Sequence, residues 1–283
     1  MPGRSQLLGA PSTYCISVRC VLDQPLFAAE ADRDDALTVI EQVRDGYDAA
    51  LFAWCLAPAA LHLVLHLPER LPVDDAWLRQ RWQRAGGGSA IPADRLRRRL
   101  TDLGGCMQTL LQRMSRARNR RHASRGAIWA GRYRACLVAD DAALLAAIAF
   151  IEGDLAPTAV ASSRDGRGPR VANPPLRVGP DGKWYPADEC PPGLPPPAAD
   201  DRQAWIARIA AELGPEHRRA YGEALAHGWA LGRPESLTGP LARLSRGPGR
   251  GRSRTLRHLA DDLGLCGVWG SKAGGPINAT RPA

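Results

Sequence analysis

The clearest alternation of apolar and polar positions lies in WCLAPAALHLVLHLPE, residues 54 to 69. It predicts two strands joined by a tight turn at Pro58 and Ala59. Successive side chains of a strand point to opposite sides of the sheet, so the second strand has two unlike faces. One face is a core row of Leu61, Leu63, Leu65 and Leu67. The other face holds Ala60, His62, Val64 and His66.

The rest of the N-terminal half alternates between helix and strand patterns. Strands are expected at residues 13 to 22 and 127 to 138, and helices at 31 to 47, at 93 to 120 with an interruption at Gly104 and Gly105, and at 140 to 153. The polar, glycine-broken stretch from Pro72 to Pro92 predicts no element. This order predicts an α+β fold with a ferredoxin-like split βαβ core, in which helices cover one face of an antiparallel sheet and leave the other face for a site.

Composition shifts divide the chain further. We expect the ferredoxin-like domain over residues 12 to 155, a Pro- and Gly-rich linker over 156 to 200, a small helical extension over 201 to 245, and a basic, flexible tail over 246 to 283.

The 283 residues are 45% hydrophobic and 24% charged, which is typical of globular proteins. The sequence has no apolar run long enough for a membrane span and no signal-peptide pattern, so we expect a cytoplasmic protein without a membrane partner. The seven cysteines are an odd number without a C-x-x-C pair. This pattern indicates that cysteines such as Cys15, Cys55 and Cys136 are small buried side chains and not parts of disulfides or of a zinc site.

Positive charge is concentrated in arginine clusters. The net charge is +9, and arginine supplies nearly all of the positive charge. The clusters are residues 95 to 99, residues 113 to 125 and residues 246 to 257. Arginine suits phosphate recognition, so this clustering predicts a nucleic-acid partner. The competing interpretation of the middle cluster is a solvated helix end, because 3.6 residues per turn spreads its arginines around the axis.

RARNRRHASRGAIWAGRYRACLVADDAALLAAIAFIE, residues 116 to 152, resembles the signature region of the IS200-like single-tyrosine transposases, most closely the REP-associated tyrosine transposases. Residues 14 to 27 resemble the family's first strand and turn, residues 54 to 69 its central hairpin, and residues 227 to 252 its C-terminal helices and basic tail. The resemblance extends over about residues 12 to 253.

The resemblance implies a metal site and a nucleophile, and both are altered. The family pairs a His-hydrophobic-His motif, which holds a divalent ion, with a tyrosine that attacks the DNA phosphate. The second metal histidine falls on His62, but the first falls on Ala60 and the tyrosine falls on Met114. His66 is about 13 Å from His62 along a strand, too far to share one ion. Tyr133 is the nearest tyrosine in sequence, and we expect it to be a packing residue.

The resemblance and the charge together imply a DNA-binding surface. Its expected residues are Arg116, Arg118, Asn119, Arg120, Arg121, His122, Arg125, Trp129, Arg132 and Arg134, with Arg250 and Arg252 of the tail. Trp129 and Tyr133 are candidates for stacking on extruded bases, although core packing is favoured for at least one of them.

We therefore expect a transposase-like protein that binds single-stranded or hairpin DNA and has lost nicking. The alternative is an active metal-dependent tyrosine transposase or nickase with a displaced nucleophile, using Mg²⁺ or Mn²⁺. A decaying gene copy without a selected role is a third possibility. No cofactor is implied with certainty, and the sequence leaves monomer and homodimer open.

Overall fold

The computed structural model describes most of the N-terminal half and several C-terminal elements. The described residues are 12 to 21, 25 to 68, 74 to 88, 91 to 154, 160 to 161, 176 to 178, 184 to 186, 214 to 245, 254 to 258 and 265 to 270.

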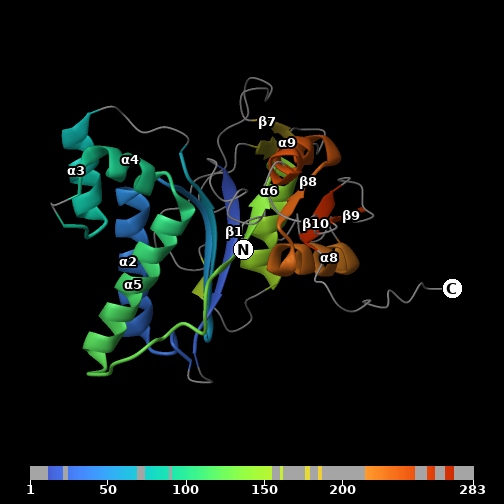
Figure 1. The fold of residues 1–283 in the computed structure, drawn as a ribbon. Helices are drawn as coiled ribbons and strands as arrows, with labels where there is room; N and C mark the ends of the chain where they lie inside the picture. Colours follow the sequence, from blue (N-terminus) through green and yellow to red (C-terminus); the bar gives the residue numbers. More distant parts are fainter. Residues whose placement is uncertain are drawn as a thin grey trace.

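A mixed sheet forms the centre of the molecule, with helices on both sides (Figure 1). The N-terminal half contributes the strands β1 (Thr13–Arg19), β2 (Ala50–Ala57), β3 (Ala60–His66) and β4 (Arg134–Val138). It also contributes the helices α2 (Glu30–Gly46), α3 (Asp75–Arg84), α4 (Ala93–Leu100), α5 (Leu103–Arg121) and α6 (Asp141–Ala149), followed by a π-helical segment η1 (Phe150–Asp154).

These elements make the predicted ferredoxin-like core. The strands lie in the order β2-β3-β1-β4, and β1 pairs antiparallel with both β3 and β4. The hairpin turns at Pro58 and Ala59, as the sequence predicted. The α+β fold class and the split βαβ order are therefore confirmed.

The C-terminal elements extend this sheet. They are β5 (Val160–Ala161), β8 (Ala230–Gly232), β9 (Arg254–His258) and β10 (Cys266–Gly270), with helices α8 (Gly214–His227) and α9 (Pro234–Ser245). A separate pair consists of β6 (Leu176–Val178) and β7 (Trp184–Pro186). β8 runs parallel to β4, and β10 and β9 follow it outward. Two segments of the expected flexible tail are thus strands, which the sequence interpretation did not foresee.

The first face of the sheet is covered by α2 and α5. The leucine row of β3 packs here with β1 residues such as Ile16 and with Met107 and Leu110 of α5. Tyr47 ties the two helices together, because its hydroxyl donates to the Gly105 carbonyl at 2.8 Å. This is the core that the sequence predicted for the leucine row.

The second face is also covered in part, so the expectation that helices lie on one face only is wrong. Cys15 and Val64 point to this side and pack among α6, η1 and α8 residues such as Leu145 and Leu225. Figure 1 shows α2 and α5 on one side of the strands and α6 and α8 on the other. The mostly apolar composition of α6 explains this position, since seven alanines and leucines on a nine-residue helix need burial on several sides.

Two helices differ from their predicted form. The helix expected over 93 to 120 is broken at Thr101 and Asp102, because the Asp102 side chain caps the new helix α5 by accepting from the Gly105 N–H at 2.6 Å. Helix α3 lies in the stretch for which no element was predicted. Its N-cap is Asp74, and its buried side chains are Leu78 and Trp82.

All six cysteines in the described residues are buried, including Cys15, Cys55 and Cys136. This agrees with the prediction for those three. Within the described ranges, no helix is both long enough and apolar enough to span a lipid bilayer.

Candidate nucleic-acid interface

The family's metal position lies on the second face of the sheet. His62 is opposite Ser17 of β1, and a hydrogen bond of 2.8 Å joins its Nδ1 to the Ser17 hydroxyl. Burial, and to a smaller extent the charge of Arg19, lower the pKa of His62 to about 4. The imidazole is therefore neutral at neutral pH and already engaged through one nitrogen.

The family's first metal position supplies no ligand beside His62, and the residue opposite His62 on β2 is Cys55. Ala60 is paired across the sheet with Arg19 and Ala57, neither of which is a metal ligand. His66 lies four residues further along β3 and forms a hydrogen bond with Thr13, with 3.1 Å between its Nδ1 and the hydroxyl oxygen; burial lowers the pKa of His66. Among the described residues no group of three His, Cys, Asp or Glu side chains is placed to hold a metal ion.

The nucleophile position lies on the other side of the sheet. Met114 is 3% exposed and packs in the first-face core with the leucine row. Ala60 and His62 alternate with that row and point to the second face. The structure therefore does not bring residues 60, 62 and 114 into one site. Tyr133 also packs against the first-face core, as expected for a packing residue.

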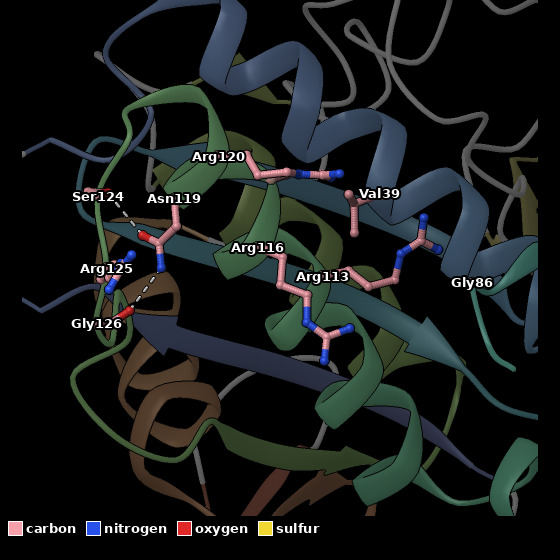
Figure 2. A pocket seen from close by; sticks show the side chains of 10 residues that line it. Val39, Gly86, Arg113, Arg116, Asn119, Arg120, Ser124, Arg125 and Gly126 are labelled. Atoms are coloured by element: carbon pink, nitrogen blue, oxygen red, sulfur yellow. Dashed lines mark hydrogen bonds between the residues drawn. The ribbon is translucent and has the colours of Figure 1, made fainter.

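Four of the predicted DNA-binding arginines, Arg116, Arg118, Arg120 and Arg121, lie in the C-terminal half of α5. A cavity of about 640 Å³ opens here between α2, α5 and the following loop (Figure 2). We call it the α5 pocket, and its lining includes Arg113, Arg116, Asn119, Arg120 and Arg125. Its other lining residues are Val39, Gly86, Ala117, Ser124 and Gly126.

Local contacts shape the α5 pocket. Asn119 donates through Nδ2 to the Gly126 carbonyl at 3.1 Å and accepts from the Ser124 hydroxyl at 3.1 Å, which fixes the loop against the helix (Figure 2). Arg113 donates to Gln42 of α2, and burial lowers the pKa of Arg113. Gly86, at φ +78°, leaves room for that guanidinium, because a Cβ there would lie 2.9 Å from it.

The exposed arginines of this pocket are Arg116, Arg120 and Arg125. In the described part of the chain no carboxylate lies within salt-bridge distance of these three. A concentration of positive charge in a concave surface attracts anions. Guanidinium groups can donate two parallel hydrogen bonds to one phosphate.

Other predicted members of this surface have structural partners instead. Arg121 forms an ion pair with Asp35 at 2.7 Å, and this contact lowers the pKa of Asp35. His122 bonds the buried Asp32, with 2.7 Å between Nε2 and Oδ1. These contacts join the end of α5 to the start of α2, so the side chains of Arg121 and His122 stabilise the helix pair.

Arg118 and Trp129 point toward the interior. Arg118 is half-buried beside Leu26, Phe27 and Met114. Trp129 donates to the Leu111 carbonyl at 3.0 Å and lies 6.5 Å from the Phe27 ring, measured between centroids. Packing is therefore the better supported role for Trp129. The sequence analysis favoured packing for at least one of Trp129 and Tyr133.

Arg132 and Arg134 are exposed, and Arg134 lies on the second face with His62. Arg134 donates to Nδ1 of His227, at the end of α8, over 2.6 Å. The predicted DNA-binding residues thus fall into two places on opposite sides of the sheet. Arg250 and Arg252 lie outside the described residues.

Sequence reasoning missed several residues around these sites. Arg113 belonged to a noted cluster but was not assigned to the interface, since only the tertiary structure places it beside Gly86. The position of Arg19 could have been predicted from the sequence, because strand alternation after Ser17 places Arg19 on the same face as His62. His227 gave none.

The fold and these surfaces define a class: an α+β protein with a ferredoxin-like core and an arginine-lined helical surface. No protein-family model and no curated protein matches the sequence. Among solved structures, the chain is similar to a REP-associated tyrosine transposase bound to a REP hairpin, at 13% identity and a TM-score of 0.35. The match covers 50% of this chain and 65% of that chain, so it spans slightly less than two thirds of the transposase.

Proposed function

We propose that this protein binds DNA, recognising single strands or hairpins, and that it does not nick the strand it binds. The observation that supports binding most directly is the α5 pocket, where Arg116, Arg120 and Arg125 are exposed around a cavity of about 640 Å³. A phosphate backbone supplies the anionic groups that such a surface attracts. The resemblance of residues 116 to 152 to single-tyrosine transposases agrees with this partner.

The absence of nicking is supported by chemistry at two positions. Met114 has a thioether, which cannot lose a proton and form a phosphoester as a tyrosine hydroxyl does. Ala60 supplies no metal ligand, and a single neutral imidazole at His62 is a weak site for Mg²⁺ or Mn²⁺. Both substitutions remove groups on which metal-assisted transesterification depends.

The alternative of a displaced tyrosine nucleophile has little geometric support. Tyr133 lies between Arg132 and Arg134 at the entry to β4 and packs on the first face. His62 and Arg134 point to the second face. A nucleophile and a metal ligand on opposite faces of one sheet do not meet at a common phosphorus atom.

The binding half of the proposal is tested with a labelled DNA hairpin that has a single-stranded flank. Its affinity for the full chain is compared with that of a duplex of equal length near 150 mM salt. We expect the hairpin to bind more tightly. Equal affinity, or no binding of either DNA, would remove this function.

The second half is tested by adding Mg²⁺ or Mn²⁺ to the same complex and searching for a covalent protein–DNA adduct on a denaturing gel. We expect intact DNA and no adduct. An adduct that disappears in Tyr133→Phe would establish the alternative, an active transposase with a displaced nucleophile.

A further inference from the structure

A second arginine-lined cavity lies at the opposite end of α5. It has a volume of about 600 Å³ and lies where α4 ends and α5 begins. We call it the α4 pocket, and its arginines are Arg95, Arg98 and Arg99. Its remaining lining is Thr101, Asp102, Gly104, Gly105 and Gln108.

The arginines of α4 divide into two groups by their contacts. Arg97 forms ion pairs with Asp75 at 2.5 Å and Asp94 at 2.9 Å, and thereby joins α4 to α3. Arg95 and Arg98 are exposed, and neither has a salt-bridge partner among the residues that the structure describes. One arginine thus stabilises the helix pair, whereas its neighbours keep their charge toward the cavity.

Arg99 is held in position at the wall of this pocket. Its guanidinium carbon lies 5.1 Å from the centre of the Trp82 ring, a cation–π contact. It donates to the Gln108 side chain at 3.3 Å, and its Nε is buried without a hydrogen-bond partner in the described part of the chain. A guanidinium that is already fixed in position loses little side-chain entropy on binding an anion.

One acidic side chain also lines the cavity. The Asp102 carboxylate accepts from the Gly105 N–H at 2.6 Å, so it is occupied as the cap of α5. Three arginines against one capped carboxylate leave a positive balance in the α4 pocket. This balance favours an anion over a cation as its ligand.

The two pockets are spaced along one rigid helix. Along α5 the linings of the two pockets together run from Gly104 of the α4 pocket to Arg120 of the α5 pocket, about 16 residues or roughly 24 Å. Both pockets lie on the side of the sheet that α2 and α5 cover. A strand that keeps B-form stacking has one phosphate per about 3.4 Å of rise, so some seven nucleotides span this distance.

We propose that the α4 pocket is a second phosphate-binding site, which takes the backbone of the same nucleic-acid strand that contacts the α5 pocket. This inference rests on the proposed DNA binding and adds to it a path along α5 and a minimum strand length. Strands much shorter than about seven nucleotides cover only part of this path, whereas longer strands contact the full lining of both pockets and gain affinity through the higher effective concentration of the second contact.

The test compares fluorescent single strands of about 5 and about 20 nucleotides on the full chain. The key variant is Arg95→Ala with Arg98→Ala, which removes two exposed charges from the α4 pocket. The matched control is Arg219→Ala with Arg233→Ala, which removes the same charge from exposed positions on α8 and after β8. Circular dichroism verifies that each variant keeps the fold.

We expect the α4-pocket variant to bind the long strand roughly tenfold more weakly near 150 mM salt, and its log K against log salt slope to fall by about 1.4. The advantage of the long strand over the short one should shrink in this variant and persist in the control. Equal behaviour of variant and control overturns the inference. Binding to anionic lipid vesicles instead of either strand also overturns it.

The two proposals fail differently. If Arg116→Ala with Arg120→Ala weakens DNA binding but the α4-pocket variant does not, the α4 pocket is no DNA site and the proposed function stands. If the unaltered protein binds neither strand, the proposed function fails first, and the inference fails with it.

Discussion

At the scale of single residues, the surroundings of His62 determine its protonation state and its hydrogen bonding. Burial and nearby Arg19 lower its pKa to about 4, and Ser17 occupies one ring nitrogen. The charged form is thus disfavoured in the folded protein but not in the unfolded chain. The role best supported for His62 is that of a neutral, hydrogen-bonded strand residue.

This pKa predicts a pH dependence of stability. An unfolded histidine titrates near 6.5, so between pH 6.5 and 4 the unfolded chain binds a proton that folded His62 does not. The contribution of His62 to stability is complete above about pH 6.5 and is lost as the pH falls toward 4. From pH 7.5 to 4.5 we expect the loss to be about 2 to 3 kcal/mol.

Urea unfolding of the native chain and of His62→Gln at both pH values measures this term. Glutamine keeps a hydrogen-bonding group for Ser17 but does not titrate, so the variant should lose less stability on acidification. The same loss in both proteins would show that His62 is not the titrating group.

Met114 gives a second prediction at the residue scale. Ala60→His with Met114→Tyr recreates the family's residue types but places them on opposite faces of the sheet. We expect no covalent adduct with hairpin DNA and Mn²⁺. A tyrosine at a core position that is 3% exposed should also cost about 1 to 3 kcal/mol of stability.

Adduct formation that requires the change at position 114 would contradict this expectation. It would mean that α5 rearranges enough to bring residue 114 to the second face. Met114→Leu with Ala60→His serves as the control, since leucine keeps the core apolar.

At the scale of elements, strong periodic patterns allowed a helix or strand to be predicted from the sequence, and weak patterns did not. The leucine row predicted β3 and its buried face, because alternation over seven residues has no helical equivalent. Helix α3 was missed although Asp74, Leu78 and Trp82 fit a capped amphipathic helix, since the glycines after it dominated the interpretation. Strands β8 to β10 are three to five residues long, too short for periodicity to identify.

The candidate site was only partly predictable for a related reason. The sequence predicted a helix where Arg113, Arg116, Arg118 and Arg120 lie, and α5 occupies that position. It did not reveal that Arg121 and His122 turn toward Asp35 and Asp32 of α2, because those partners are about 90 residues away in the chain. Tertiary packing, rather than composition, separates structural arginines from available ones.

The distinction between structural and DNA-contacting residues can be tested on helices α2 and α5. Asp32→Ala removes the hydrogen bond between its Oδ1 and His122, and should lower the free energy of unfolding by about 1 to 2 kcal/mol without weakening DNA binding. Arg116→Ala should do the reverse, weakening DNA binding several-fold while leaving stability within about 0.5 kcal/mol. Chemical denaturation and fluorescence anisotropy measure the two effects. Loss of DNA affinity in Asp32→Ala alone would place the DNA contact at the α2 end instead.

At the scale of the whole molecule, the sheet separates two surfaces. The first side holds α2, α4 and α5 with the two arginine-lined pockets, and the second side holds His62, Arg134 and the C-terminal helix α8 (Figure 1). The residues that a metal-dependent transposase would combine are divided between these sides. The two arginine-lined pockets, which we propose as phosphate contacts, lie on one of them.

The central claim, DNA binding through the α5 pocket, is tested most directly by the salt dependence of hairpin binding in Arg116→Ala with Arg120→Ala. Removing two phosphate contacts should weaken binding roughly tenfold near 150 mM salt and reduce the log K against log salt slope by about 1.4 to 1.8. Arg219→Ala with Arg233→Ala should change neither value appreciably. An unchanged slope and affinity in the α5-pocket variant would contradict the account.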